Sequence, residues 1–144
     1  MRKCIDSLLI GGEDVEILIV NDGSKDDTQK IGEEYRIVTD RWQKVTDEVL
    51  DTVLMEKLSG YCDEFLIHAV DVEGKASGIE KELAAMLGEW GRIPVTYAGG
   101  VHSYEDLSLL KELGRNHLNV TIGSALDLFG GSLQWDKVIA KIKE

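Results

Sequence analysis

Apolar runs and amphipathic segments alternate along most of the chain. The apolar runs are short, rich in β-branched residues and bounded by polar residues or glycine, which is the pattern of buried parallel strands. Such strands are predicted over residues 16–20, 36–39, 64–70, 93–98 and 118–122. Apolar residues at helical spacing predict helices over residues 2–10, 24–35, 46–60, 79–90, 103–114 and 135–142. Because strands and helices alternate, the predicted fold class is α/β, with parallel βα repeats and right-handed crossovers.

Capping residues mark the ends of two of the predicted helices. Thr46 is the expected N-cap of a helix that points Val53 toward the core and ends at Gly60. Ser103 and Asp106 have the spacing of a capping box, so the next-to-last helix is expected to begin at this pair.

Two strand-to-turn junctions near the end of the sequence carry candidate chemistry. Residues 95–101 and 120–126 each consist of an apolar run that ends in glycine, and a helical pattern follows each of them. Ligands of parallel βα folds bind at the carboxyl ends of the strands, where turn amides and helix N-termini can bind an anion. The pair therefore predicts a phosphate site, unless the glycines only permit tight turns. Neither turn contains Arg or Lys, so binding should vary only modestly with salt.

Composition excludes several classes of function. Asp and Glu number 27 against 16 Lys and Arg, a formal net charge of −11, and no basic run is present, so neither nucleic acid nor a membrane is an expected partner. Cys4 and Cys62 have neither metal-ligand spacing nor a disulfide framework, and we predict no metal and no cofactor. We expect no secretory or transmembrane segment, and hence a cytoplasmic protein.

A second motif lies near the start of the sequence. Residues 3–9 have helical spacing, and a strand that begins at residue 17 follows them and ends in the turn Asn21-Asp22-Gly23-Ser24. This part of the chain, residues 1–35, resembles the opening of a family 2 glycosyltransferase. In that family the aspartate of a similar turn contacts the nucleotide of a sugar donor, so the resemblance implies this role for Asp22. The Asp-x-Asp metal motif and the catalytic base of the family have no counterpart in this sequence.

Three later segments carry a second resemblance: residues 65–74 (FLIHAVDVEG), 95–100 (VTYAGG) and 121–131 (TIGSALDLFGG). Residues 36–144 resemble the C-terminal half of the phosphoribosylformimino-5-aminoimidazole carboxamide ribotide isomerases of histidine biosynthesis, in their eukaryotic-like form. The resemblance implies half of a TIM (βα)₈ barrel and an Amadori rearrangement, the isomerisation of an aldose to a ketose, on a ribotide that bears two phosphates. It further implies that one phosphate lies at the last two strands, bound by Gly99, Gly100, Gly123 and Ser124.

The same resemblance implies three substrate-binding side chains. Trp42 matches a loop tryptophan that stacks on the substrate ring, and Asp71 and Glu73 match the polar end of the sixth barrel strand. Simpler interpretations remain open: Trp42 could cover apolar surface, and Asp71 and Glu73 could be ordinary solvated carboxylates. His68 lies within an apolar strand, and we interpret it as a hydrogen-bonded interior histidine rather than a catalytic base.

The chain departs from the isomerase pattern in a respect that matters for catalysis. The first four βα units, which carry the base and the second phosphate site, have no counterpart. We expect the strand at residues 16–20 to stand in for the fifth barrel strand, with Asp22 as a candidate catalytic acid. Residues 1–35 then form an αβα fragment within the same domain as the half-barrel of residues 36–144, a splice of two families.

A half-barrel has two open sheet edges and one uncovered apolar face. We therefore expect self-association or closure against a complementary half-barrel, and little or no turnover by this chain alone. The leading hypothesis is a truncated or chimeric ribotide isomerase that retains one site for a phosphorylated ribotide. Two alternatives are a nucleotide-sugar-binding glycosyltransferase remnant that uses Asp22 and a non-enzymatic phosphate-binding half-barrel.

Overall fold

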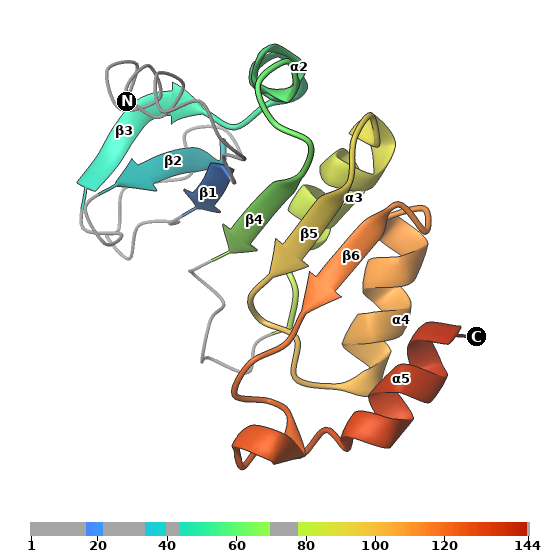
Figure 1. Ribbon diagram of the computed structural model, residues 1–144. Helices are drawn as coiled ribbons and strands as arrows, with labels where there is room; N and C mark the ends of the chain where they lie inside the picture. Colours follow the sequence, from blue (N-terminus) through green and yellow to red (C-terminus); the bar gives the residue numbers. More distant parts are fainter. Residues whose placement is uncertain (1–16, 22–33, 40–43, 70–77, 144) are drawn as a thin grey trace.

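The computed structural model describes residues 17–21, 34–39, 44–69 and 78–143, and its centre is one sheet of six strands in the order β3-β2-β1-β4-β5-β6 (Figure 1). The strands are β1 (Ile17–Asn21), β2 (Arg36–Thr39), β3 (Lys44–Val49), β4 (Phe65–Ala69), β5 (Val95–Ala98) and β6 (Leu118–Thr121). β1, β4, β5 and β6 pair in parallel, as predicted. The prediction of a parallel strand at residues 36–39 is wrong in its direction, because β2 pairs antiparallel with both β1 and β3. β1 is the parallel neighbour of β4, so the strand predicted at residues 16–20 belongs to the same sheet as the later strands.

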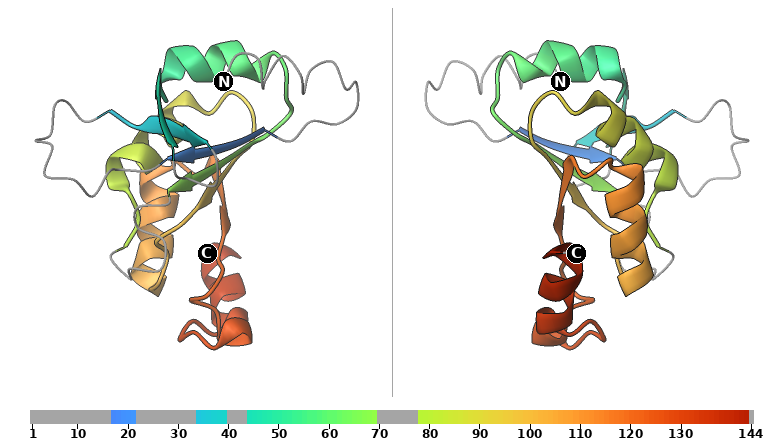
Figure 2. Two further views of the ribbon diagram at one scale, coloured as in Figure 1. Left: turned by 90° about the vertical axis from the view of Figure 1, so that its left-hand side faces the viewer. Right: turned by 90° about the vertical axis from the view of Figure 1, so that its right-hand side faces the viewer.

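The helices are α2 (Thr52–Ser59), α3 (Lys81–Trp90), α4 (Tyr104–Leu113) and α5 (Trp135–Lys143), with a 3₁₀ turn, η1 (Asp127–Phe129), before α5. α3 and α4 lie on the same side of the parallel strands (Figure 2). Each presents an apolar stripe to the sheet, and Leu83 and Leu87 of α3 are completely buried. The predicted helix over residues 2–10 lies outside the described residues, as do residues 24–33 of the second predicted helix.

The core lies between these helices and one face of β4 and β5. Phe65 and Ile67 alternate with outward residues along β4, and Val95 and Tyr97 do so along β5. The parallel register places Phe65 beside Val95 and Ile67 beside Tyr97, and all four side chains are fully buried. Burial of this size, roughly 1.5–3 kcal/mol for each large apolar side chain, fixes which face of each strand meets the helices.

The opposite face of β4, β5 and β6 is mixed rather than apolar, which corrects the expectation of an uncovered apolar face for this part of the sheet. Leu66 of β4 lies in register with Thr96 and Asn119, and His68 lies in register with Ala98 and Thr121. Thr96 Oγ1 donates a hydrogen bond of 2.5 Å to Glu64 Oε1, and Asn119 and Thr121 are exposed. The polar side chains on this face lower the hydrophobic free energy that would drive association there.

The prediction of a helix that begins at Thr46 is wrong, because residues 44–49 form β3. Thr46 Oγ1 donates a 2.7 Å hydrogen bond to the Ile37 carbonyl of β2, and the α2 helix begins later, where Asp51 Oδ1 accepts from Leu54 N at 2.7 Å. Val53, expected to face the core, is 74% exposed. The antiparallel partner strand, which supplies backbone hydrogen bonds, outweighs the local helical spacing.

Other predicted helix ends are confirmed. Ser103 Oγ accepts from Asp106 N at 3.1 Å while Asp106 Oδ2 accepts from Ser103 N at 3.0 Å, which completes the capping box of α4. Gly60 and Gly114 follow α2 and α4 as their C-caps. The end predicted at Tyr35 for the helix over 24–35 is wrong, because residues 34–35 are not helical.

Tyr97 joins the sheet to the start of α3. Its hydroxyl accepts a 2.9 Å hydrogen bond from the Glu80 amide, the N-cap residue of α3, and the ring is fully buried. Burial, which disfavours the charged phenolate, raises the pKa of Tyr97 well above its ordinary value. Since the raised pKa belongs to the folded state, this group stabilises the fold below the ordinary tyrosine pKa of about 10 and loses that contribution as pH rises above it.

We predict that the free energy of unfolding falls as pH rises above about 10, and that Tyr97→Phe makes the decline shallower. At neutral pH the variant loses about 1 kcal/mol, because one hydrogen bond to the Glu80 amide is removed. Urea unfolding at several pH values measures both effects. Tyr61→Phe is the matched control, since Tyr61 is 53% exposed and should leave the pH dependence unchanged. Equal pH dependence in Tyr97→Phe and in the unmodified protein would contradict this account.

Candidate functional site

A cleft of about 590 Å³ opens at the carboxyl ends of β4, β5 and β6. The four residues predicted to bind phosphate, Gly99, Gly100, Gly123 and Ser124, all line it. The parallel register brings them together, because Ala98 at the end of β5 pairs with Thr121 at the end of β6. The structure thus places both glycine turns at one cleft, at the end of the sheet where parallel βα folds bind ligands.

The turn after β5 depends on glycine for its backbone conformation. Gly99 and Gly100 have φ angles of +106° and +74°, in the left-handed region that side chains other than glycine rarely adopt. A Cβ atom at Gly99 would lie 2.4 Å from the Ala69 carbonyl oxygen at the end of β4. Gly99 is therefore required for the fold as well as for the shape of the cleft.

The turn after β6 has a different construction. Nothing lies within 4 Å of the position that a Cβ atom would take at Gly123, and this glycine does not have a positive φ angle. The chain then folds back on itself: Leu126 N donates to the Gly123 carbonyl at 3.0 Å, and Leu133 N donates to the Ala125 carbonyl at 2.9 Å. Gly123 can accept a side chain without backbone strain, so it is the better position for testing the cleft.

Backbone amides are the main donors that the cleft offers. Within the described residues, no hydrogen-bond acceptor is found for the amides of Gly100, Gly123 and Ser124. Among the residues that the structure describes, no Arg or Lys lines the cleft, and the titratable side chains that do so are His68 and His102. Amides and a serine hydroxyl in a glycine-rich turn suit an anionic oxygen such as that of a phosphate.

The N-termini of the following helices are occupied by carboxylates of the chain itself. Asp106 caps α4, and Asp127 Oδ1 accepts from Trp135 N, the first residue of α5, at 3.2 Å. The expectation that helix starts add positive charge to a phosphate site is therefore not supported, because each carboxylate offsets the local dipole. In the part of the chain that the structure describes, the turns rather than these helix starts are therefore available to an anion.

Tyr104 connects the segments that follow β5 and β6. It is the first residue of α4, and its hydroxyl accepts a 2.9 Å hydrogen bond from Gln134 N, immediately before α5. The ring also packs against the hydrophobic core. This bond joins the start of α4 to the segment just before α5.

We predict that Tyr104→Phe lowers the free energy of unfolding by about 1 kcal/mol, because the aromatic ring stays and one hydrogen bond is lost. Chemical denaturation measures the change. Ser108→Ala is the control: its hydroxyl bonds only the Tyr104 carbonyl on the exposed side of α4, so the loss should stay below about 0.5 kcal/mol. Equal losses of unfolding free energy in the two variants would contradict the prediction that the Tyr104–Gln134 hydrogen bond stabilises the fold more than an exposed one does.

Four sequence-predicted site residues, Asp22, Trp42, Asp71 and Glu73, lie outside the described residues, and their roles stay predictions. The described strands nevertheless end side by side: Asn21, the last residue of β1, is the register partner of Ala69, the last residue of β4. No group of three or more His, Cys, Asp or Glu side chains in the described part of the chain could hold a metal ion. None of its helices is long and apolar enough to cross a membrane.

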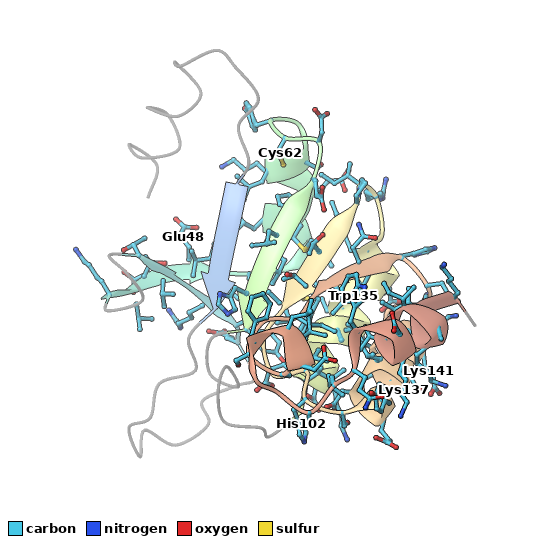
Figure 3. All side chains as sticks on the ribbon, turned by 60° about the horizontal axis from the view of Figure 1, so that its bottom comes forward. Glu48, Cys62, His102, Trp135, Lys137 and Lys141 are labelled. Carbon is cyan, nitrogen blue, oxygen red and sulfur yellow. The ribbon has the colours of Figure 1, made fainter. Side chains whose placement is uncertain are left out.

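Sequence reasoning placed neither histidine of the cleft there. His68, interpreted as an interior residue, is only partly buried and lines the cleft on the mixed face of β4. His102 was not singled out, although it follows the Gly99-Gly100 turn directly after Val101. Its Nδ1 atom lies 2.8 Å from Asp106 Oδ2, and Figure 3 shows it in the turn that leads to α4. Its position between the glycine turn and the helix cap was the signal available in the sequence.

Comparison with known proteins finds one matching family. Residues 17–133 match the family described as histidine biosynthesis protein. Similar relatives are named 1-(5-phosphoribosyl)-5-((5-phosphoribosylamino)methylideneamino) imidazole-4-carboxamide isomerase. The Medicago truncatula relative, named as chloroplastic, is 55% identical over 106 residues, which cover 74% of this chain and 34% of the relative. The Yarrowia lipolytica relative is 48% identical over 99 residues, 66% of this chain and 38% of the relative. The Eremothecium gossypii relative is 47% identical over 107 residues, 71% of this chain and 41% of the relative.

Proposed function

This chain belongs to the family of histidine biosynthesis proteins, and from that premise we propose that it supplies one phosphate-binding site of a phosphoribosyl isomerase. The observation that carries the proposal is the cleft at the ends of β4, β5 and β6, where two glycine turns offer backbone amides to one ligand. The compound in the name of these relatives contains two phosphoribosyl groups, so each of its molecules has two phosphates to bind. We assign one of them to Gly99, Gly100, Gly123 and Ser124.

The reaction that we propose for the whole site is the Amadori isomerisation of an aldose to a ketose. Such a reaction moves a proton between neighbouring carbons and needs an acid and a base on the two sides of the sugar. Asp22 remains our candidate acid, and Trp42, Asp71 and Glu73 remain candidates for contacts to the rest of the substrate. The neighbouring ends of β1 and β4 support this choice, since both strands lead toward the same edge of the sheet.

The chain spans between about a third and two fifths of the length of the relatives it matches. We propose that it forms half of a (βα)₈ barrel and reaches full activity only when a complementary half, or a second copy, completes the barrel. Two features support this: β6 is the terminal strand of the described sheet, and the mixed face of β4 to β6 carries the cleft. Of the alternatives, a non-enzymatic phosphate-binding half-barrel would use the same cleft.

A glycosyltransferase origin of the first 35 residues has less support. The match to histidine biosynthesis proteins begins at residue 17 and therefore includes β1, the strand that precedes Asp22. Under the glycosyltransferase alternative, a nucleotide sugar should bind and the loss of Asp22 should abolish that binding. A cytoplasmic location also stays a prediction, since the Medicago truncatula relative is named as chloroplastic.

We predict that ribose 5-phosphate binds to the chain and that Gly123→Val weakens its binding at least about tenfold, because the added side chain would occupy open space at the cleft. Isothermal titration calorimetry measures the affinity, and thermal unfolding shows whether the fold is kept. Asn119→Val is the control, since it adds a β-branched residue to β6 away from the cleft lining. Affinity that is unchanged in Gly123→Val would contradict the proposed site.

Gly99→Ala should behave differently from Gly123→Val. The left-handed φ angle and the contact with the Ala69 carbonyl should cost about 2 kcal/mol or more of folding free energy. Loss of phosphate binding in Gly99→Ala would therefore accompany loss of stability, whereas in Gly123→Val the two effects are expected to separate.

We predict that the chain alone gives little or no isomerisation of the ribotide substrate and that the N-terminal portion of an isomerase relative restores turnover. The reason is that the base and the second phosphate site are assigned to barrel units with no counterpart in this chain. An absorbance assay of the isomerisation, run with light scattering on the same mixtures, links turnover to the mass of the complex. Substantial turnover by the chain alone that survives Asp22→Asn would refute both the half-barrel account and the assignment of the acid.

A further inference from the structure

We propose that His102 makes phosphate binding at this cleft dependent on pH, with tighter binding when its imidazole ring is protonated. The inference rests on the proposed function, since it concerns the same cleft. His102 lines the cleft beside Gly100, at the point where the β5 turn leads into α4. It is thus placed to add a charged donor beside the two described turns, which offer uncharged amides and a serine hydroxyl.

The Asp106 carboxylate, which is fixed by several hydrogen bonds, lies next to the His102 ring. Asp106 Oδ2 accepts hydrogen bonds from His102 N at 3.1 Å, from Ser103 N at 3.0 Å and from Ser103 Oγ at 2.8 Å. His102 Nδ1 lies 2.8 Å from the same oxygen, without the alignment of a hydrogen bond. The side chain of Asp106 is 12% exposed, so its position is set by these contacts rather than by solvent.

The orientation of the ring determines which nitrogen can meet a ligand. Nδ1 is buried against Asp106, whereas the whole His102 side chain is 41% exposed. Nε2 is therefore the nitrogen that can face an anion. In the neutral ring with a proton on Nδ1, Nε2 is an acceptor and offers nothing to a phosphate oxygen; in the protonated ring it is a donor.

Protonation also changes the charge of this wall of the cleft. The pair formed by His102 and Asp106 carries one negative charge when the imidazole is neutral, and none when it is protonated. Histidine side chains as a class change charge between about pH 5 and 8. Within the described residues, the titratable groups placed near His102 are Asp106 of α4, whose Oδ2 lies 2.8 Å from Nδ1, and His68 of β4, which lines the same cleft. Among the described residues no Arg or Lys lines the cleft, so no lysine or arginine cation from this part of the chain masks the charge of His102.

Phosphate monoesters titrate too, with a second pKa of about 6, and their dianions predominate at higher pH. This ligand effect favours binding at high pH and is the same for every variant of the protein. The contribution of His102 is therefore read from the ratio between variants at each pH, and not from the pH profile of one protein.

The experiment is a calorimetric titration of ribose 5-phosphate into the full chain at about pH 6 and pH 8. Three proteins are compared: the unmodified chain, His102→Gln and His102→Lys. A hydrogen bond to a charged group is stronger than one between neutral groups, so His102→Gln should bind at least about tenfold more weakly than the unmodified chain at pH 6. The two should agree within about twofold at pH 8. His102→Lys, which keeps a positive charge, should bind more tightly than the unmodified chain at pH 8.

Two controls separate this proposal from others. His68→Gln should leave the ratio between pH 6 and pH 8 unchanged, whereas loss of the pH effect in that variant would move the role to His68 and overturn the proposal. Equal binding by all His102 variants at both pH values would overturn it while the phosphate site remains. No binding by any protein at either pH, with folding confirmed by circular dichroism, would overturn both this proposal and the proposed function.

Discussion

The parallel register of β4, β5 and β6 is the constraint on which the candidate site depends. Residues far apart in the sequence reach one cleft only because Ala98 and Thr121 end their strands side by side and His68 lies level with both. The register itself follows from burial, since a shift by one residue would turn Phe65 and Tyr97 away from α3 and α4. The same apolar pattern that builds the core therefore places the polar turns.

The glycines of the two turns serve different physical purposes. Gly99 has a positive φ angle that other residues rarely adopt, and it lets the chain after β5 pass close to the Ala69 carbonyl. Gly99 is therefore needed for folding. Gly123 faces open space and has no such constraint, so its lack of a side chain matters for what the cleft can admit. The electrostatics are equally local: in a chain with a net charge of −11, Asp106 and Asp127 occupy the helix starts that could otherwise attract an anion. Among the described residues, the turn amides, the Ser124 hydroxyl and the two histidines of the cleft are the groups that a phosphate could contact.

The sequence predicted the parallel strands, the Ser103 cap and the meeting of the two glycine turns, because these depend on apolar runs and local chemistry. It failed at residues 46–49, because Val49 and Val53 have helical spacing although Val49 ends β3 and Val53 belongs to α2. Only the antiparallel partner β2, which is a tertiary feature, decides between helix and strand there. His102 was missed for a similar reason, since its significance comes from its distance to Asp106 and from its place in the cleft.

The central claim is that the two glycine turns form one binding site for a single phosphate group. Amide chemical-shift mapping by ¹H–¹⁵N NMR during a titration with ribose 5-phosphate tests it most directly, because each turn reports separately. The account predicts that the amides of Gly100, Gly123 and Ser124 shift together, with one common dissociation constant. Shifts that map to the turn at Asp22 and leave these three amides unchanged would contradict it.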